Sequence, residues 1–218
     1  MGMIVVVVGA DTNDVFSPCS DSQVSRGDGF SFGLVFSTRE SFFLNGVQLS
    51  PCDTRLPLAG TSAELATFRP KVDELSLLTI NNSQFNPVKN GGFMVAFSGR
   101  KYAARSFPVM VADSTNTITS FTLVLEFQKG ILQNLFWKSF GCGSCTGDSS
   151  VCVNQQDCGV QISKCRSNGG SADCNMSIQL AFSGTDKNHE ALNSWYEVSN
   201  LRQFSLHDMF AGALSSLI

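Results

Sequence analysis

Several features that carry common functions are scarce or missing in this 218-residue chain. Charged residues make up only 15% and the net charge is −3, so neither nucleic acid nor an anionic lipid surface is expected as a partner. No stretch approaches the ~20 consecutive apolar residues of a membrane-spanning helix. Phosphate-binding and dinucleotide-binding glycine motifs are also missing. We therefore predict a protein with no cofactor, no nucleic acid partner and no membrane span.

Catalytic signatures are equally sparse. His189 and His207 are the two histidines on which a Ser–His or Cys–His arrangement would depend, and no G-x-S-x-G nucleophile elbow occurs. Carboxylate pairs are harder to exclude, because glycoside hydrolysis requires them close in space and not in sequence. Glu126 and the pair Asp73-Glu74 lie in or just before expected strands, where acidic residues are usually solvated. We predict no catalytic residue, with a carboxylate-dependent hydrolase of cell-wall polysaccharide as the alternative.

Cysteine, by contrast, is abundant. Six of the eight cysteines lie in the segment from Cys142 to Cys174, which is rich in Gly, Ser, Asn and Asp. Such a polar segment cannot bury enough apolar surface to order itself, whereas disulfides would supply the missing constraint. Disulfides imply an oxidising compartment, so we predict a secreted, extracellular protein. The expected disulfide cysteines are Cys19, Cys52, Cys142, Cys145, Cys152, Cys158, Cys165 and Cys174.

The even number of cysteines allows one pairing to be argued. If the six clustered cysteines pair among themselves, Cys19 and Cys52 remain for each other, while the connectivity within 142–174 stays open. Cys142 and Cys145 have the spacing of half a zinc site, but the cluster offers neither a second close pair nor a nearby histidine. We therefore predict four disulfides and no bound metal.

The amino-terminal segment agrees with secretion. Residues 1–10 read M-G-M-I-V-V-V-V-G-A, and the chain turns polar from Asp11. Val8 and Ala10 are short residues of the kind that signal peptidase accepts at its −3 and −1 positions. We interpret 1–10 as the remnant of a signal peptide and 11–218 as a single β domain. A buried β-strand within 1–10 is the alternative interpretation.

Three short motifs bear on modification and adhesion. The triplets Asn81-Asn82-Ser83 and Asn175-Met176-Ser177 are acceptor sequences for N-glycosylation, so Asn81 and Asn175 are candidate glycan sites. Arg26-Gly27-Asp28 spells a cell-adhesion tripeptide, but three residues are weak evidence. We interpret this tripeptide as a plain turn.

Apolar residues alternate with a period of two through most of the chain, which is typical of half-buried strands. The alternation is clearest at 30–37 and 117–128, and Asn45-Gly46 between apolar runs predicts a hairpin. Further strands are expected at 75–80, 93–98, 109–112, 131–138 and from Ile178 onward.

A helix is predicted only at the carboxyl end. From Leu206 to Leu217 the apolar residues recur at helical spacing, and Ser205 is placed to cap this helix. The predicted fold is all-β: an antiparallel β-sandwich or jelly-roll-like domain, with a disulfide-rich excursion at 141–175 and a short C-terminal helix at 205–217.

The aromatic residues are 18 Phe, 2 Tyr and 2 Trp. Phe at alternating strand positions is expected in the core, whereas rings that stack on sugars or lie at a wet interface are more often Trp or Tyr, which carry a polar group. Trp195 and Tyr196 are therefore candidate binding residues, followed by Trp137 and Tyr102. The alternative is that each is a large residue of the core or its cover.

Six long blocks of the chain together carry a resemblance to a known family. They are A-D-T-N-D-V-F-S-P-C (10–19), F-R-P-K-V-D-E-L-S-L-L-T-I-N (68–81), M-V-A-F-S-G-R-K-Y-A-A-R-S (94–106), S-F-T-L-V-L-E-F-Q-K-G (120–130), C-G-S-C-T-G (142–147) and L-A-F-S-G-T-D-K (180–187). These blocks resemble a plant family of secreted proteins, the "Expp" extracellular proteins. The resemblance spans nearly the whole chain after Ala10 and implies an apoplastic or cell-wall setting and an upstream signal peptide. It implies no active-site residue.

From these features we expect a secreted, disulfide-stabilised binding or structural protein of the plant apoplast or cell wall, without catalytic activity. Its expected partner is a cell-wall glycan or an extracellular protein. A hydrolase of cell-wall polysaccharide and a defence-related protein-interaction module are the alternatives. Carboxyl groups ~5–10 Å apart in a cleft would favour the hydrolase, whereas an exposed Trp/Tyr platform would favour a glycan-binding protein.

Overall fold

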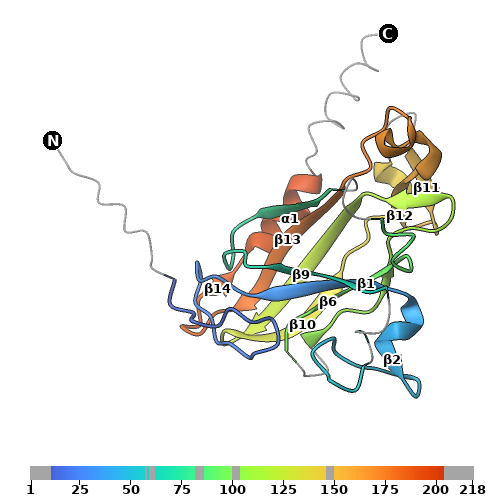
Figure 1. Cartoon of the computed structure of the whole chain (residues 1–218). Helices are drawn as coiled ribbons and strands as arrows, with labels where there is room; N and C mark the ends of the chain where they lie inside the picture. The colour runs from blue at the N-terminus through green and yellow to red at the C-terminus, as the bar shows by residue number, and fades with distance from the viewer. Residues whose placement is uncertain are drawn as a thin grey trace, which may run out of the picture.

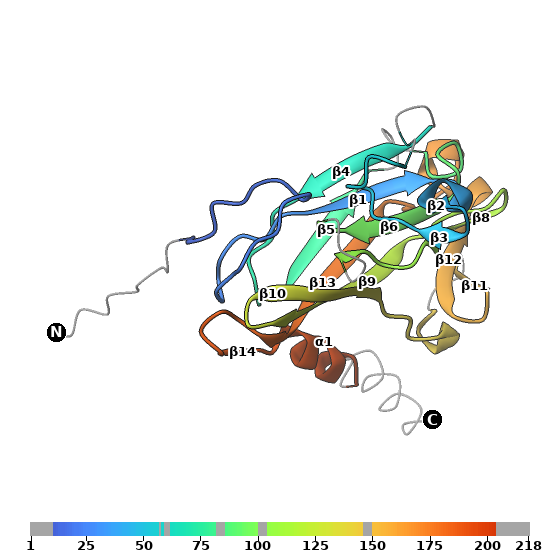
Figure 2. The ribbon, with the colours of Figure 1, turned by 90° about the horizontal axis from the view of Figure 1, so that it is seen from below.

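The computed structural model describes residues 11–56, 58, 62–81, 86–99, 104–145 and 150–203. In these ranges the chain is mostly β-structure, with one α-helix near the end of the described part. Two sheets face each other as a sandwich, and the cysteine-rich segment extends from one end of it (Figures 1 and 2). The predicted all-β sandwich is confirmed.

The first layer is a four-stranded antiparallel sheet with the strand order β4-β1-β6-β7. β1 is buried along its whole length because both of its faces are covered. Phe32 and Leu34 face the sandwich core, while Val35 packs with Phe42 and Val95 on the outer face. The strands are β1 (Phe32–Ser37), β4 (Glu64–Phe68), β6 (Phe93–Phe97) and β7 (Val109–Met110).

The second layer is a five-stranded sheet in which β13 pairs with β9 on one side and with β5 and β14 on the other. β9 and β13 run parallel, with Ser120 opposite Ser177, so this pair is an exception to the predicted antiparallel arrangement. The other pairs in the sheet are antiparallel. The strands are β5 (Ser76–Ile80), β9 (Ser120–Gln128), β10 (Ile131–Trp137), β13 (Met176–Thr185) and β14 (Ala191–Leu192).

Two tight turns fix the register of local hairpins. Asn45 and Gly46 have φ angles of 51° and 79° and join β2 (Phe43–Leu44) to β3 (Val47–Gln48). Lys129 and Gly130, with φ angles of 52° and 74°, join β9 to β10 in the same way. Positive φ at both central residues is typical of the type I′ turn, whose twist matches the flanking strands. The predicted Asn45-Gly46 hairpin is confirmed.

The core lies between the two sheets and contains the residues that the alternating pattern assigned to it. Phe30 and Phe127 meet edge to face across the layers, with ring centroids 5.0 Å apart. Both layers are thereby joined by one continuous apolar cluster. Its predicted members include Phe30, Phe32, Leu34, Phe36, Phe121, Leu123, Leu125, Phe127, Ile178, Leu180 and Phe182.

The cysteine-rich excursion contains regular structure that the sequence did not predict. Its strands β11 (Ser150–Val153) and β12 (Asp157–Gln161) form a hairpin, and β12 also pairs with β8 (Asn116–Ile118). This third sheet attaches the excursion to the strand that leads into β9. Short 3-10 helices are η1 (Arg39–Phe42) near β2, and η4 (Cys142–Ser144), η5 (Ile162–Lys164) and η6 (Arg166–Asn168) in the excursion.

Helix α1 (Ser194–Gln203) lies beside β13 on the outer face of the five-stranded sheet (Figure 2). Val198 is buried in this contact. The sequence did not predict α1, because its apolar residues form no clear stripe, although Ser194 and Glu197 have the spacing of a capping box. The predicted helix at 205–217 and the predicted signal-peptide remnant at 1–10 lie outside the described residues.

Candidate functional site

Four disulfides join all eight cysteines of the chain. Cys19 pairs with Cys52, as predicted, and the six clustered cysteines pair among themselves. Each thiolate that a zinc ion would need is consumed in a disulfide, which agrees with the interpretation of the cluster as covalent staples. The pairs inside the cluster are Cys142–Cys152, Cys145–Cys158 and Cys165–Cys174.

Two of these disulfides hold the base of the excursion rigidly. Cys152 and Cys158 lie opposite each other on the β11–β12 hairpin. Their partners, Cys142 and Cys145, both belong to the short turn that follows β10. The hairpin is therefore clamped at two points to the end of a strand of the main sheet. A polar loop fixed in this way to a β scaffold is suited to making contacts.

An aromatic pair connects the excursion with helix α1. The ring of Phe140, which precedes the excursion by one residue, lies 6.4 Å from the ring of Trp195, centroid to centroid. Trp195 is half-buried, Phe140 is 37% exposed, and the neighbouring Tyr196 is 68% exposed. Two segments far apart in sequence thus bring two aromatic rings together, and the exposed Tyr196 follows Trp195 in the chain. We call Phe140, Trp195 and Tyr196 the aromatic surface.

The position of Trp195 is fixed by hydrogen bonds at the start of α1. The Asp73 carboxylate accepts hydrogen bonds from the backbone N–H groups of Asn193 and Ser194, at 2.7 and 2.8 Å. The backbone N–H of Phe182, on β13, donates to Ser194 Oγ at 2.8 Å. The two Asp73 contacts satisfy amides that a helix start leaves without intrahelical partners. They also fix the residue immediately before Trp195 to the sheet.

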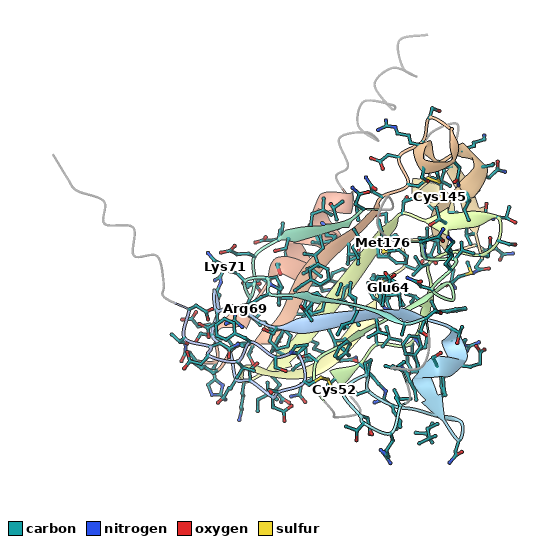
Figure 3. All side chains as sticks on the ribbon, in the orientation of Figure 1. Cys52, Glu64, Arg69, Lys71, Cys145 and Met176 are labelled. Carbon is teal, nitrogen blue, oxygen red and sulfur yellow. A yellow bond between two sulfur atoms is a disulfide. The ribbon has the colours of Figure 1, made fainter. Side chains whose placement is uncertain are left out.

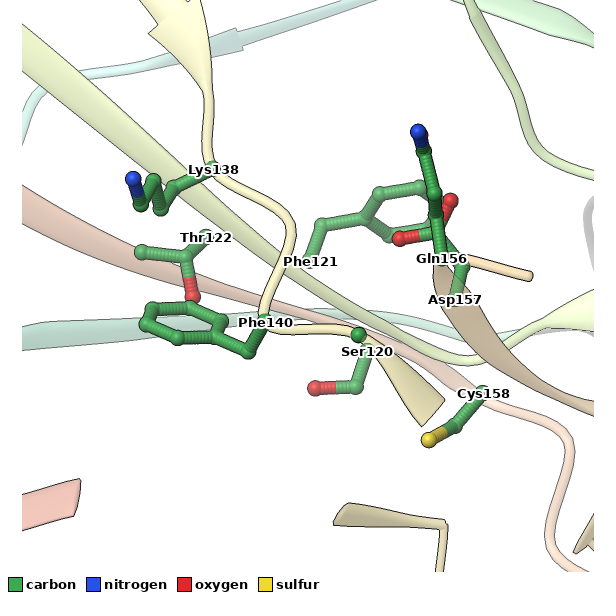
Figure 4. Close-up of a pocket in the computed structure, with 9 residues that line it drawn as sticks. Ser120, Phe121, Thr122, Lys138, Phe140, Gln156, Asp157 and Cys158 are labelled. Atoms are coloured by element: carbon green, nitrogen blue, oxygen red, sulfur yellow. The ribbon is translucent and has the colours of Figure 1, made fainter. Parts of the chain in front are cut away.

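A small notch lies beside Phe140, where the excursion meets the five-stranded sheet (Figure 4). Gln156 and Asp157 form one side, while Lys138, Thr122 and Phe140 form the other, with Phe121 between them. The notch has a volume of about 50 Å³, well below the roughly 300 Å³ or more of pockets that enclose drug-sized ligands. It is lined by Ser120, Phe121, Thr122, Lys138, Phe140, Gly141, Gln156, Asp157 and Cys158.

The other predicted aromatic residues lie elsewhere. Trp137 is half-buried against the core, where its ring meets Phe121 edge to face at 5.7 Å. Its Nε1–H donates to Ser106 Oγ at 2.9 Å, so the polar group of the indole is used inside the fold. We therefore leave Trp137 out of the aromatic surface. Tyr102 lies outside the described residues. Phe140 was not predicted, because binding rings were sought only among the Trp and Tyr residues.

The two candidate glycosylation sites differ in exposure. Asn81 is exposed directly after β5. Asn175 is half-buried between Cys174 and the first residue of β13. Their modification stays a prediction.

The Arg26-Gly27-Asp28 tripeptide forms a turn, as predicted. Asp28 is 2% exposed, and its carboxylate accepts hydrogen bonds from the backbone N–H groups of Thr12 and Ser25, at 2.7 and 2.6 Å. Arg26 pairs with Asp73, with Nε to Oδ2 at 3.0 Å. The charged groups of the tripeptide are thus engaged in contacts within the fold.

Two carboxylates at this end of the sandwich have a lowered pKa. For Asp11, the hydrogen bond from the backbone N–H of Asn13 and the bond from the Arg69 guanidinium lower the pKa. For Asp186, burial raises the pKa, but hydrogen bonds from backbone N–H groups outweigh burial, so the pKa lies below its ordinary value. The donors are Arg26, Asn188 and Glu190.

These polar contacts lie away from the excursion. Arg69 and Lys71 are at the end of the sandwich opposite Cys145 (Figure 3). Asp28 and Asp186 accept backbone hydrogen bonds from neighbouring loops, and Asp73 accepts them at the start of α1, so these three carboxylates hold segments of the fold together. Glu126 is exposed on β9. In the described ranges, no group of three or more His, Cys, Asp or Glu side chains is arranged to hold a metal ion.

None of the helices in the described part of the chain has the length and apolar character needed to cross a membrane. Residues 1–118 and 112–217 match a family model described as "Uncharacterised protein DDB_G0273449". No curated protein matches the chain. No solved structure matches it either.

Proposed function

The chain belongs to the family described as "Uncharacterised protein DDB_G0273449", and we propose that it is an extracellular binding protein without catalytic activity. Its four disulfides and β-rich fold fit an extracellular role. The resemblance of its sequence blocks to secreted plant proteins supports an apoplastic or cell-wall setting.

One observation carries the proposal: the contact between Phe140 and Trp195, beside the exposed Tyr196. Large exposed aromatic rings that are held in place lose little conformational entropy on binding, and they dominate the energetics of many interfaces. Both sides of this aromatic surface are held in place. Disulfides clamp the segment after Phe140, and Asp73 fixes the start of the helix that carries Trp195.

The arrangement of the carboxylates supports binding over hydrolysis. A retaining or inverting glycosidase needs two carboxyl groups across a cleft wide enough for a sugar bond. Asp28, Asp73 and Asp186 each accept hydrogen bonds from backbone N–H groups. The lining of the notch beside Phe140 contains one carboxylate, that of Asp157.

The test compares retention on isolated plant cell-wall material of the wild-type protein and two alanine variants. Trp195→Ala removes the central ring, and Phe107→Ala removes a ring that is 74% exposed outside the aromatic surface. An aromatic hot spot typically contributes ~2 kcal/mol or more, so Trp195→Ala should weaken retention at least ~10-fold, while Phe107→Ala should leave it unchanged.

Circular dichroism of both variants controls for folding. Equal retention of the wild type and Trp195→Ala would contradict the proposed surface. Release of reducing sugars from the wall material, abolished by Glu126→Gln, would identify a hydrolase instead.

A further inference from the structure

We propose that the aromatic surface and the adjacent notch bind an uncharged saccharide chain, with a sugar ring against Phe140 and Trp195 and its hydroxyl groups directed into the notch. This inference rests on the proposed binding function and assigns the chemical class of the ligand. It joins two features that share Phe140: a partly exposed aromatic pair and a preformed polar recess.

The chemistry of the notch lining favours hydroxyl groups. A sugar hydroxyl both donates and accepts hydrogen bonds, so it is best matched by a site that offers both functions. The Gln156 amide and the Ser120 hydroxyl each donate and accept, the Lys138 ammonium donates, and the Asp157 carboxylate accepts. The described hydrogen bond to the Asp157 side chain comes from Ser139 Oγ, at 3.2 Å to Oδ1, and a carboxylate accepts several hydrogen bonds at once.

The charges near the notch favour an uncharged ligand. Lys138 and Asp157 both line it, so their charges offset each other. A chain of uronic acids would therefore meet at least as much repulsion as attraction.

The dimensions of the site favour a chain lying across the surface. A volume of about 50 Å³ admits a few hydroxyl groups but lies far below the roughly 300 Å³ or more of pockets that enclose a whole small-molecule ligand. The rest of the sugar must remain outside the notch, where the partly exposed rings of Phe140 and Trp195 provide an apolar face. A surface site of this kind leaves room for neighbouring sugar units on both sides.

Disulfides preform the recess. Cys158 lines the notch and is bonded to Cys145. Ser139 Oγ donates to the backbone carbonyl of Gln156 at 2.7 Å, so the strand end and the hairpin are held together. A site that exists before the ligand arrives avoids the entropic cost of ordering its loops.

The experiment is calorimetric titration of the oxidised protein with three hexasaccharides. Two are uncharged and β-1,4-linked, one of glucose and one of N-acetylglucosamine, and the third is α-1,4-linked galacturonic acid. We expect at least one of the two uncharged chains to bind, and hexagalacturonate to bind at least ~10-fold more weakly. Trp195→Ala should reduce affinity at least ~10-fold, and Gln156→Ala several-fold. Phe107→Ala is the matched control and should change nothing.

Asp157→Asn supplies a sharper test, because it removes the charge and keeps the shape. This variant should bind hexagalacturonate with an affinity closer to its affinity for the uncharged chains. Preferential binding of hexagalacturonate by the wild type would overturn the inference. The inference would also be overturned if both Gln156→Ala and Asp157→Asn bound the uncharged chain with the affinity of the wild type. In that case, weaker binding of the chain by Trp195→Ala would still support the aromatic surface as the binding site. If none of the three chains binds, the saccharide assignment is wrong; wall retention that still depends on Trp195 would leave the proposed function standing.

Discussion

Asp73 and Ser194 are 121 positions apart in the sequence, yet the Asp73 carboxylate accepts a hydrogen bond from the backbone N–H of Ser194 at 2.8 Å. The connection between β4 and β5, which leads from one sheet to the other, thus supplies the cap for the helix that lies on the five-stranded sheet. A cap from so far away makes the orientation of α1, and of Trp195 with it, depend on the folding of the whole sandwich.

Replacing Asp73 should therefore destabilise the protein measurably. Asp73→Ala removes the acceptor for two backbone N–H groups and the partner of Arg26, and we expect a loss of about 1–2 kcal/mol in the free energy of unfolding. Asp73→Asn keeps an acceptor and tolerates the positive φ of 67° at this position, so it should cost less. Urea denaturation measures both, and equal losses for the two variants would contradict the capping role.

The stability should also depend on the protonation of Asp186. Its folded-state pKa lies below the ordinary value, so its contribution to stability is fully present above about pH 4 and is lost as the pH falls through the folded-state pKa. The difference in unfolding free energy between the wild type and Asp186→Asn should therefore shrink on acidification from pH 7 toward pH 3. A difference that grows over this range would show that folding raises the pKa of Asp186 and does not lower it.

The disulfides should contribute unequally to the stability of the folded protein. Cys19–Cys52 closes a loop of 33 residues and Cys165–Cys174 one of 9. In the chain-entropy description the longer loop stabilises by about 1 kcal/mol more. The double serine variant at Cys19 and Cys52 should therefore be the less stable of the two double variants in chemical denaturation. Cys52, Cys165 and Cys174 are buried to a similar degree, and the reverse order of stability would assign the difference to local packing.

The buried Asp28 leads to a prediction about cell adhesion. Its carboxylate is 2% exposed and hydrogen-bonded to Thr12 and Ser25, so the folded protein should not support adhesion through Arg26-Gly27-Asp28. A linear peptide of residues 20–32 should compete in an integrin-dependent adhesion assay, while the oxidised protein should not. Competition by the folded protein at similar concentration would mean that this turn opens easily.

Much of the sandwich could be predicted, because its strands alternate strictly. Phe121, Leu123, Leu125 and Phe127 all reach the core as the pattern indicates, and Asn45-Gly46 forms the expected hairpin. Such local patterns identify strands but not their partners. The parallel pairing of β9 with β13 depends on contacts between distant segments, which one sequence does not display.

The elements that were missed have long-range causes. Helix α1 has few apolar residues and takes its cap from Asp73, so local sequence gives little sign of it beyond Ser194 and Glu197. The β11–β12 hairpin adds Val153 to the core between the sheets, but covalent links from Cys142 and Cys145 also hold it, and their pairing cannot be read from the sequence. The sequence did indicate Trp195 and Tyr196 as candidate binding residues. Phe140 was missed, although its position just after the alternating strand and just before Gly141 was an available signal.

The parallel pairing of β9 and β13 also bears on the order of events during folding. The whole excursion, with its three internal disulfides, lies in the connection between these strands. Each disulfide shortens the length of free chain that must be closed before Ser120 can meet Ser177, and so lowers the entropic barrier to that contact. We expect refolding to be faster when these three bonds are already formed than from the fully reduced chain. Oxidation of a surface segment thus sets the rate at which the central sheet is completed.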